Sequence, residues 1–295
     1  MRTYLECIPC FFKQSLETSR ILGIKEELQK KILDEIGRHL SDFSLTASPP
    51  EMGKIIHNVI KKYTGTSDPF KDIKKRSNEM VLGVYNNLKE KIESSSDSLL
   101  TAVEFSIAGN IIDFGVRRDI NIEKEINKIL EFEKQSMERG IFDYECFKKS
   151  LEESVSVLFI GDNAGEIVLD KILIEEIKRR WKEKEIIYAV RDVPIINDAT
   201  LEDAFQCGMD KVCRVISSGS DAPGTILSLC SKQFLNIFKN ADMVISKGQG
   251  NFESLSDEKR PIFFLLMVKC DIVARDIGVK KGDIVLFYNR KNEGM

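Results

Sequence analysis

The pattern of apolar residues changes near residue 150, and this change constrains the fold more than any other feature of the sequence. Before it, apolar residues recur at helical spacing, as at Ile32, Ile36 and Leu40. After it come short runs rich in β-branched and aromatic residues, most of them separated by helical patterns. We therefore expect an all-helical domain over residues 1–150 and an α/β domain over residues 151–295.

Short apolar runs in the second half are the predicted strands. They span residues 155–160, 186–190, 211–216, 243–245, 262–268 and 284–287. Strands that alternate with helices favour right-handed crossovers and a mainly parallel sheet with helices on both faces. The last run follows the fifth closely, so we leave open that it pairs in a different direction.

Two boundaries within the helical half are marked by the sequence. Ser48-Pro49-Pro50-Glu51 predicts a helix start with proline in the first turn. The polar stretch from Ser94 to Asp97 separates two helical segments. Both stretches are expected to be surface loops.

Composition and charge exclude several classes of function. The 295 residues are 42% hydrophobic, and 44 basic against 47 acidic residues give a net charge of -3. Without a positive field, nucleic acid is not an expected partner.

Met1 begins no recognisable signal peptide and no apolar run reaches membrane-spanning length, so we expect a cytoplasmic protein without membrane contact. Seven cysteines in such a chain predict reduced thiols. The oligomeric state is not predicted.

Polar tracts follow the first five predicted strands. In open parallel sheets, ligands bind beyond the carboxyl ends of the strands, so these tracts are expected to line one crevice. Any one tract is explained equally well by turns or helix caps, but lysine and paired carboxylates are not needed to turn a chain. The tracts are Gly161–Glu166, Arg191–Asp198, Ser217–Asp221, Ser246–Glu253 and Lys269–Asp271.

Three of these residues suggest a metal site. Asp162, Asn163 and Asp198 offer hard oxygen ligands, which suit magnesium or manganese. An incomplete protein shell would leave positions for water and substrate.

Lys247 suggests a phosphate site. It lies beside Gly248 and Gly250, where backbone N–H groups can approach an anion while the ammonium neutralises its charge. A metal opposite lysine and amide donors is the apparatus of phosphoryl transfer, and phosphoester hydrolysis is the simplest such reaction. The tract from Gly161 to Gly165 is not G-x-G-x-x-G, which disfavours a dinucleotide site.

The motifs resemble those of a known family. Gly-Asp-Asn-Ala-Gly-Glu at 161–166, Asn-Asp at 197–198 and Ser-Lys-Gly-Gln-Gly-Asn-Phe-Glu at 246–253 resemble the damage-control phosphatases, formerly a domain of unknown function with the number eighty-nine. The resemblance covers essentially the whole chain. It implies a helical part, a Rossmann-like part, and metal-dependent hydrolysis of small phosphorylated metabolites with Mn²⁺, Mg²⁺, Ni²⁺ or Co²⁺.

The resemblance also implies roles for individual residues. Asp162, Asn163 and Asp198 would bind the metal, and Asp162, Asp198 and Lys247 would serve catalysis. In the helical half, Asn110 and Asp113 would reach the substrate, with interhelical hydrogen bonding as the alternative. The expected substrate contacts are Asn110, Asp113, Glu166, Ser217, Ser218, Gly219, Lys247, Gly248, Gly250 and Glu253.

Three cysteines lie in motifs that resemble those of a microbial subgroup of this family. Cys7-Ile8-Pro9-Cys10 and Lys269-Cys270 match its C-x-x-C and its later Lys-Cys. If the N-terminus folds over the crevice, Cys7, Cys10 and Cys270 would form a second metal or redox site. The alternative is that they pack as small hydrophobic residues.

Other functions remain open on sequence alone. A Rossmann-like sheet with an early glycine-rich turn also suits an adenosyl-cofactor-dependent methyltransferase, although three metal-type ligands fit it poorly. A non-enzymatic metal or nucleotide sensor is the third hypothesis. Whether Asp162 is a ligand or also a nucleophile is undecided, and a sugar phosphate, a nucleotide or a damaged phospho-cofactor would each fit as substrate.

Overall fold

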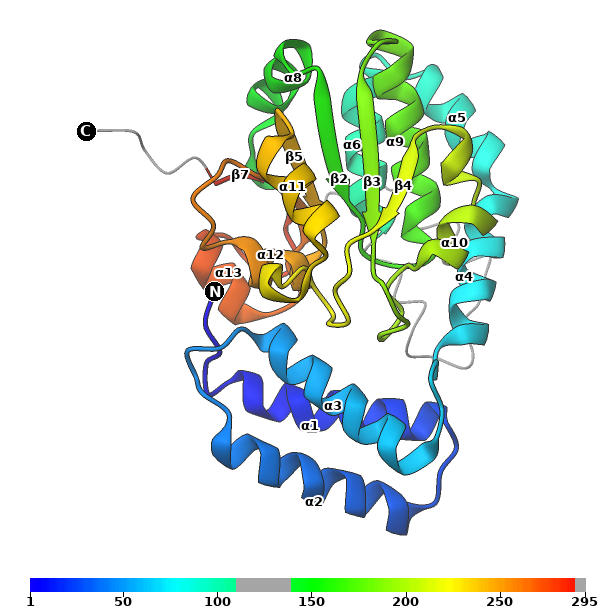
Figure 1. The fold of residues 1–295 in the computed structure, drawn as a ribbon. Coiled ribbons are helices and arrows are strands. Elements are labelled where there is room, and N and C mark those ends of the chain that lie inside the picture. Colours follow the sequence, from blue (N-terminus) through cyan, green and yellow to red (C-terminus); the bar gives the residue numbers. More distant parts are fainter. Residues whose placement is uncertain (110–138, 290–295) are drawn as a thin grey trace, which may run out of the picture.

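The computed structural model describes residues 1–109 and 139–289 of the chain. Its first helices form two groups, three that lie below the sheet and three that share the core on one face of the sheet (Figure 1). The first group is α1 (Cys7–Ile21), α2 (Glu26–Asp42) and α3 (Pro49–Thr64). The second group is α4 (Lys71–Gly83), α5 (Tyr85–Glu93) and α6 (Ser98–Ala108).

A seven-stranded sheet in the order β1-β7-β6-β5-β2-β3-β4 forms the centre of the molecule. All neighbouring strands are parallel except β6 and β7, which are antiparallel. The strands are β1 (Arg139–Phe142), β2 (Ser156–Ile160), β3 (Glu185–Val190), β4 (Arg214–Ser217), β5 (Met243–Lys247), β6 (Phe263–Met267) and β7 (Ile284–Tyr288).

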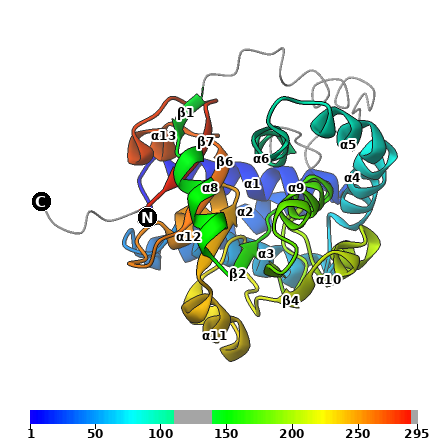
Figure 2. The same ribbon diagram turned by 90° about the horizontal axis from the view of Figure 1, so that it is seen from above.

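Helices cover both faces of the sheet because alternate strand residues point in opposite directions. Val157 and Phe159 pack into a core with α6, α8 and α9, and Leu158 and Ile160 pack into a second core with α11, α12 and α13. Helices α6 and α9 lie side by side (Figure 2). The later helices are α8 (Tyr144–Glu153), α9 (Glu166–Arg180), α10 (Leu201–Gln206), α11 (Lys232–Asn240), α12 (Gln249–Leu255) and α13 (Asp271–Ile277).

Helices α1 to α3 share a small core of their own. Ile32, Ile36, Met52 and Ile56 are fully buried there. Helix α3 starts as the sequence predicted, with Ser48 and Glu51 forming a reciprocal capping box that encloses the two prolines of the first turn. This layer contacts the sheet half through α3 and α12.

The mainly parallel α/β sheet and the predicted strands are confirmed, with two differences of detail. A short strand, β1, lies within the range expected to be helical. Strand β4 begins at Arg214 instead of residue 211, because Met209–Lys211 forms a 3₁₀ turn. Helices α4 to α6 share the core of the sheet, and the division into two domains at residue 150 stays a prediction. Within the described residues, no helix is both long enough and apolar enough to cross a membrane.

The strand order reverses direction next to β2. From β2 the chain proceeds to β3 and β4 on one side, and then returns to β5 and β6 on the other. The loops that follow β2 and β5 therefore diverge at this point, and such a divergence is where doubly wound sheets bind their ligands.

Candidate functional site

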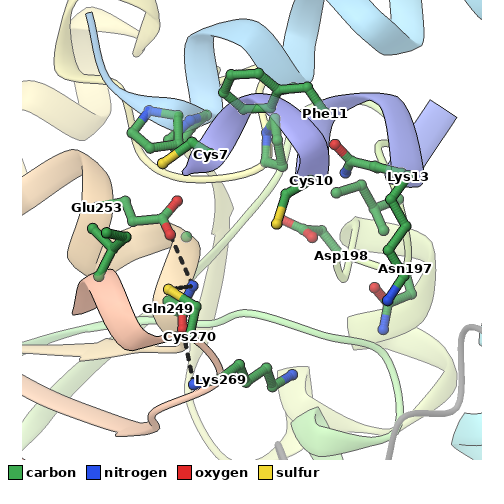
Figure 3. Close-up of a pocket in the computed structure, with 18 of the residues that line it drawn as sticks. Cys7, Cys10, Phe11, Lys13, Asn197, Asp198, Gln249, Glu253, Lys269 and Cys270 are labelled. Carbon is green, nitrogen blue, oxygen red and sulfur yellow. Dashed lines mark hydrogen bonds between the residues drawn. The ribbon is translucent and has the colours of Figure 1, made fainter. Parts of the chain in front are cut away.

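A pocket of about 420 Å³ opens at this divergence. Its floor consists of residues that follow β2, β3, β5 and β6, together with Pro223 from the segment after β4, and its other wall consists of α1 and the start of α3. Figure 3 shows side chains from both walls, among them Cys10 and Lys13 of α1 opposite Asp198 and Lys269. Four of the five predicted tracts, those after β2, β3, β5 and β6, thus supply one crevice, whereas the tract Ser217–Asp221 after β4 does not line it.

Asp162, Asn163 and Asp198 lie together on the floor of the pocket. An isolated antiparallel bridge joins Asn163 to Asp198, and the amide of Ala199 donates to the carbonyl of Asp162 at 2.8 Å. These backbone contacts hold the loop after β2 against the loop after β3. Two carboxylates and one amide oxygen form a donor set that suits a hard divalent cation and leaves positions for other ligands, so the residues present fit such an ion.

Arg191 supports this floor from below. Its side chain is completely buried, which is rare for arginine, and its Nε donates to Asp198 at 2.7 Å. The same guanidinium donates to Thr225 and Asn251 and lies 3.8 Å from the Asp162 carboxylate. Its planar group therefore fixes the orientation of Asp198 through several bonds at once.

The pKa values of the carboxyl groups of Asp162 and Asp198 are both raised. Burial raises the pKa of Asp162 well above its usual range, and the charges of Asp198 and Glu166 raise it further, against the opposing charges of Arg191 and Lys269. Burial also raises the pKa of Asp198, with Arg191 opposing the shift. Strongly perturbed carboxyl groups in a pocket are typical of functional sites, and a bound cation would favour their ionised forms.

Lys247 lies behind the floor, in a buried cluster. It has no exposed surface, and its ammonium donates to Glu166 at 2.5 Å, to Asp170 at 2.5 Å and to the carbonyl of Ser106 at 2.8 Å. Burial alone would lower the pKa of Lys247, but the two carboxylates outweigh it and the pKa is raised. The predicted contact of Lys247 with phosphate therefore stays a prediction without a counterpart in the described structure.

Gly248 makes room for the Asp162 carboxylate. Its φ is +80°, and a Cβ on this residue would lie 1.9 Å from Oδ2 of Asp162. Gly248→Ala is therefore expected to displace Asp162 and to lower the free energy of unfolding by about 1–3 kcal/mol in urea titrations. Gly83→Ala is the control, because nothing lies within 4 Å of a Cβ there. Equal stability of the two variants would contradict this account.

The pocket is also lined by Glu253 and the three cysteines. Burial raises the pKa of Glu253 to about 7, with the hydrogen bond from Gln249 and the N-terminal ammonium opposing the shift. Gln249 donates to Glu253 at 2.9 Å and to the Cys270 sulfur at 3.6 Å, as Figure 3 shows in part. Cys7, Cys10 and Cys270 line this pocket and are free thiols, and burial raises the pKa of Cys7 and Cys270.

The second metal or redox site at these cysteines stays a prediction. The structure brings all three to one pocket, as expected if the N-terminus covers the crevice. Across residues 1–109 and 139–289, however, no group of three or more histidine, cysteine, aspartate or glutamate side chains is arranged to hold a metal ion. The proposed ligand set of Asp162, Asn163 and Asp198 is not such a group, because only two of its members are carboxylates and the third is an amide.

The remaining predicted residues are distributed as follows. Gly250 and Glu253 line the pocket, whereas Glu166 and Gly248 support it from behind. The turn of Ser217, Ser218 and Gly219 lies outside the pocket lining. There the Ser217 hydroxyl donates to Asp192 at 2.6 Å, and Ser218 is buried. Asn110 and Asp113 lie outside the described residues.

Three charged residues of this region were given no individual role by the sequence predictions. Arg191 directly follows a predicted strand, and Asp170 interrupts the apolar face of a helix one turn after Glu166. Each of these positions predicts a charged side chain that is buried. Lys269 lines the pocket near enough for its charge to act on Asp162, although the sequence predictions used it only as part of the tract after the fifth strand and of a Lys-Cys motif.

Comparisons with known proteins agree on one family. The model of the damage-control phosphatase ARMT1-like domain matches residues 3–285. A damage-control phosphatase of Pyrococcus horikoshii is 34% identical over 98% of this chain and 99% of its own length, and one of Archaeoglobus fulgidus is 35% identical over 95% and 96%. The crystal structure of a DUF89 family protein from Pyrococcus horikoshii superposes with a TM-score of 0.88 at 33% identity, covering 98% of this chain and all of that one. This chain therefore belongs to the damage-control phosphatase family with an ARMT1-like domain.

Proposed function

We propose that this protein is a metal-dependent phosphatase that hydrolyses phosphomonoesters of small metabolites. The observation that carries the proposal is the convergence of Asp162, Asn163 and Asp198 on the floor of one pocket at the divergence of β2 and β5. Names of relatives at 34% and 35% identity, both damage-control phosphatases, support the same reaction.

Each residue has a role in the proposed reaction. Asp162, Asn163 and Asp198 would hold Mn²⁺, Mg²⁺, Ni²⁺ or Co²⁺, which when bound supplies a Lewis acid for a phosphoryl oxygen and lowers the pKa of water. Arg191 keeps the Asp198 carboxylate aimed at the pocket. Lys269 lines the same pocket and adds positive charge where the phosphate would lie.

The dimensions of the pocket favour small substrates. A volume of about 420 Å³ is at the low end of the range for small-molecule sites. Phe11, Gln14 and Glu17 of α1 line this pocket and would contact the leaving group of the substrate, which departs with the ester oxygen. A phosphorylated metabolite with hydroxyl groups fits such a mixed apolar and polar wall.

Metal removal is the direct test. Protein stripped with a chelator is expected to release no phosphate from an aryl phosphate or from a panel of sugar phosphates and nucleotides. Release should return when one of the four metals is restored, because the carboxylates repel a phosphoryl group of the same sign unless a bound cation neutralises both. The measurement is colorimetric phosphate detection, with calorimetric titration of each metal in parallel. Metal binding without phosphate release from any substrate would contradict the proposal and favour a metal sensor.

A further inference from the structure

The side-chain amide of Asn163 is held by two carboxylates. Its Nδ2 donates to Oδ2 of Asp162 at 2.8 Å and to Oε2 of Glu166 at 3.3 Å. Carboxylate oxygens only accept hydrogen bonds, so the nitrogen of the amide must face them. The amide oxygen of Asn163, a residue that lines the pocket, is thereby turned away from both carboxylates.

Glu166 is itself fixed from the other side. Its Oε1 accepts a hydrogen bond from Lys247, and the side chain is only 1% exposed. Lys247 also binds Asp170, which in turn accepts hydrogen bonds from Ser106 at 2.7 Å and from Tyr188 at 2.8 Å. A chain of buried polar contacts therefore runs from the interior of the sheet to the amide of Asn163.

We propose that Glu166, anchored by Lys247, is a positioning residue that orients the Asn163 amide with its oxygen toward the pocket as a metal ligand. This inference rests on the metal site of the proposed function. It gives Lys247 and Glu166 a role that needs no contact with substrate. Residues that orient metal ligands in this way typically change metal affinity by about 10–100-fold when they are replaced.

Glu166→Gln tests the orientation by reversing one donor. Lys247 has only donors, so it would bind the oxygen of the new glutamine and leave the glutamine NH₂ facing Nδ2 of Asn163. Two donors would then oppose each other, and the Asn163 amide would lose its fixed orientation. Asp170→Asn is the matched control, because it also removes one carboxylate from Lys247 and does not contact Asn163.

Two readouts are needed, one with metal and one without. Calorimetric titration with Mn²⁺ should show affinity about 10–100-fold weaker for Glu166→Gln and within about twofold of the parent for Asp170→Asn. In the metal-free protein, the NMR resonance of the Asn163 side-chain NH₂, identified by its absence from Asn163→Asp, should move in Glu166→Gln and stay in place in Asp170→Asn. Thermal unfolding of each variant establishes that the folded protein is measured.

Defined outcomes would overturn the inference. It fails if Glu166→Gln binds Mn²⁺ like the parent with its Asn163 resonance unmoved, or if Asp170→Asn weakens binding as much. If Glu166→Gln does not fold, Glu166→Asp takes its place, since it keeps the charge opposite Lys247 but withdraws the acceptor from Asn163. Parent-like Mn²⁺ affinity in that variant would also overturn the inference. Failure of the proposed function is seen separately, as an unsubstituted protein that releases no phosphate.

Discussion

Asp162→Ala is expected to lower the rate of phosphate release by about 10³-fold, because it removes a charged ligand of the proposed metal and because metal stabilisation of a phosphoryl transition state is worth several kcal/mol. The variant should nevertheless stay folded. Burial raises the pKa of Asp162, so the ionised carboxylate costs stability at neutral pH and its removal relieves that cost. Phosphate release and thermal unfolding, measured on the same sample, check both statements.

The control for Asp162→Ala is Asp276→Ala. Asp276 is exposed on α13 and lies outside the pocket lining, so its removal should leave the rate unchanged. A rate for Asp162→Ala close to that of the control would exclude Asp162 from the reaction. If Asp162→Ala is folded but has no metal affinity and no turnover, the Asp162 carboxylate acts as a metal ligand.

Lys247→Met is expected to lower the free energy of unfolding by about 3–5 kcal/mol, since removing one partner of a buried ion pair leaves an uncompensated charge. Here two buried carboxylates, Glu166 and Asp170, would lose their shared cation. Such a loss is a large fraction of the stability of an ordinary domain. Urea unfolding followed by circular dichroism measures it.

Lys239→Met provides the comparison for this substitution. Lys239 is exposed in the last turn of α11, and its replacement should change stability by less than about 0.5 kcal/mol. If Lys247→Met were equally mild, the carboxylates would have to be protonated in the folded protein, and the ion pairs would contribute little.

The sequence predicted the sheet and the floor of the pocket because both follow from periodic, local signals. Strands such as β2 and β3 are continuous apolar runs, which is typical of parallel strands buried on both faces. Once those strands are placed, the topology alone brings Asp162 and Asp198 to the same edge. Strand β1 escaped prediction because its four residues are mostly half-buried and, in the part of the chain that the structure describes, pair with β7 alone.

The environment of individual charges was not predictable in the same way. A lysine next to two glycines suggests an exposed phosphate ligand, since lysine is almost never fully buried without a partner. The partners of Lys247 come from α6 and α9, which are distant in sequence, so only the tertiary structure shows that it is enclosed. Arg191 was expected only as part of a polar tract, because its partners Thr225 and Asn251 are also distant in sequence.

The small core shared by α1, α2 and α3 has an evolutionary consequence. One wall of the pocket belongs to this unit, whereas the metal-type ligands belong to the sheet, so the two walls are stabilised by separate sets of packed side chains. Substitutions on the α1 face that lines the pocket are therefore expected to add independently to changes on the floor. Selection can diversify the range of accepted metabolites in that layer while the reactive groups stay constant.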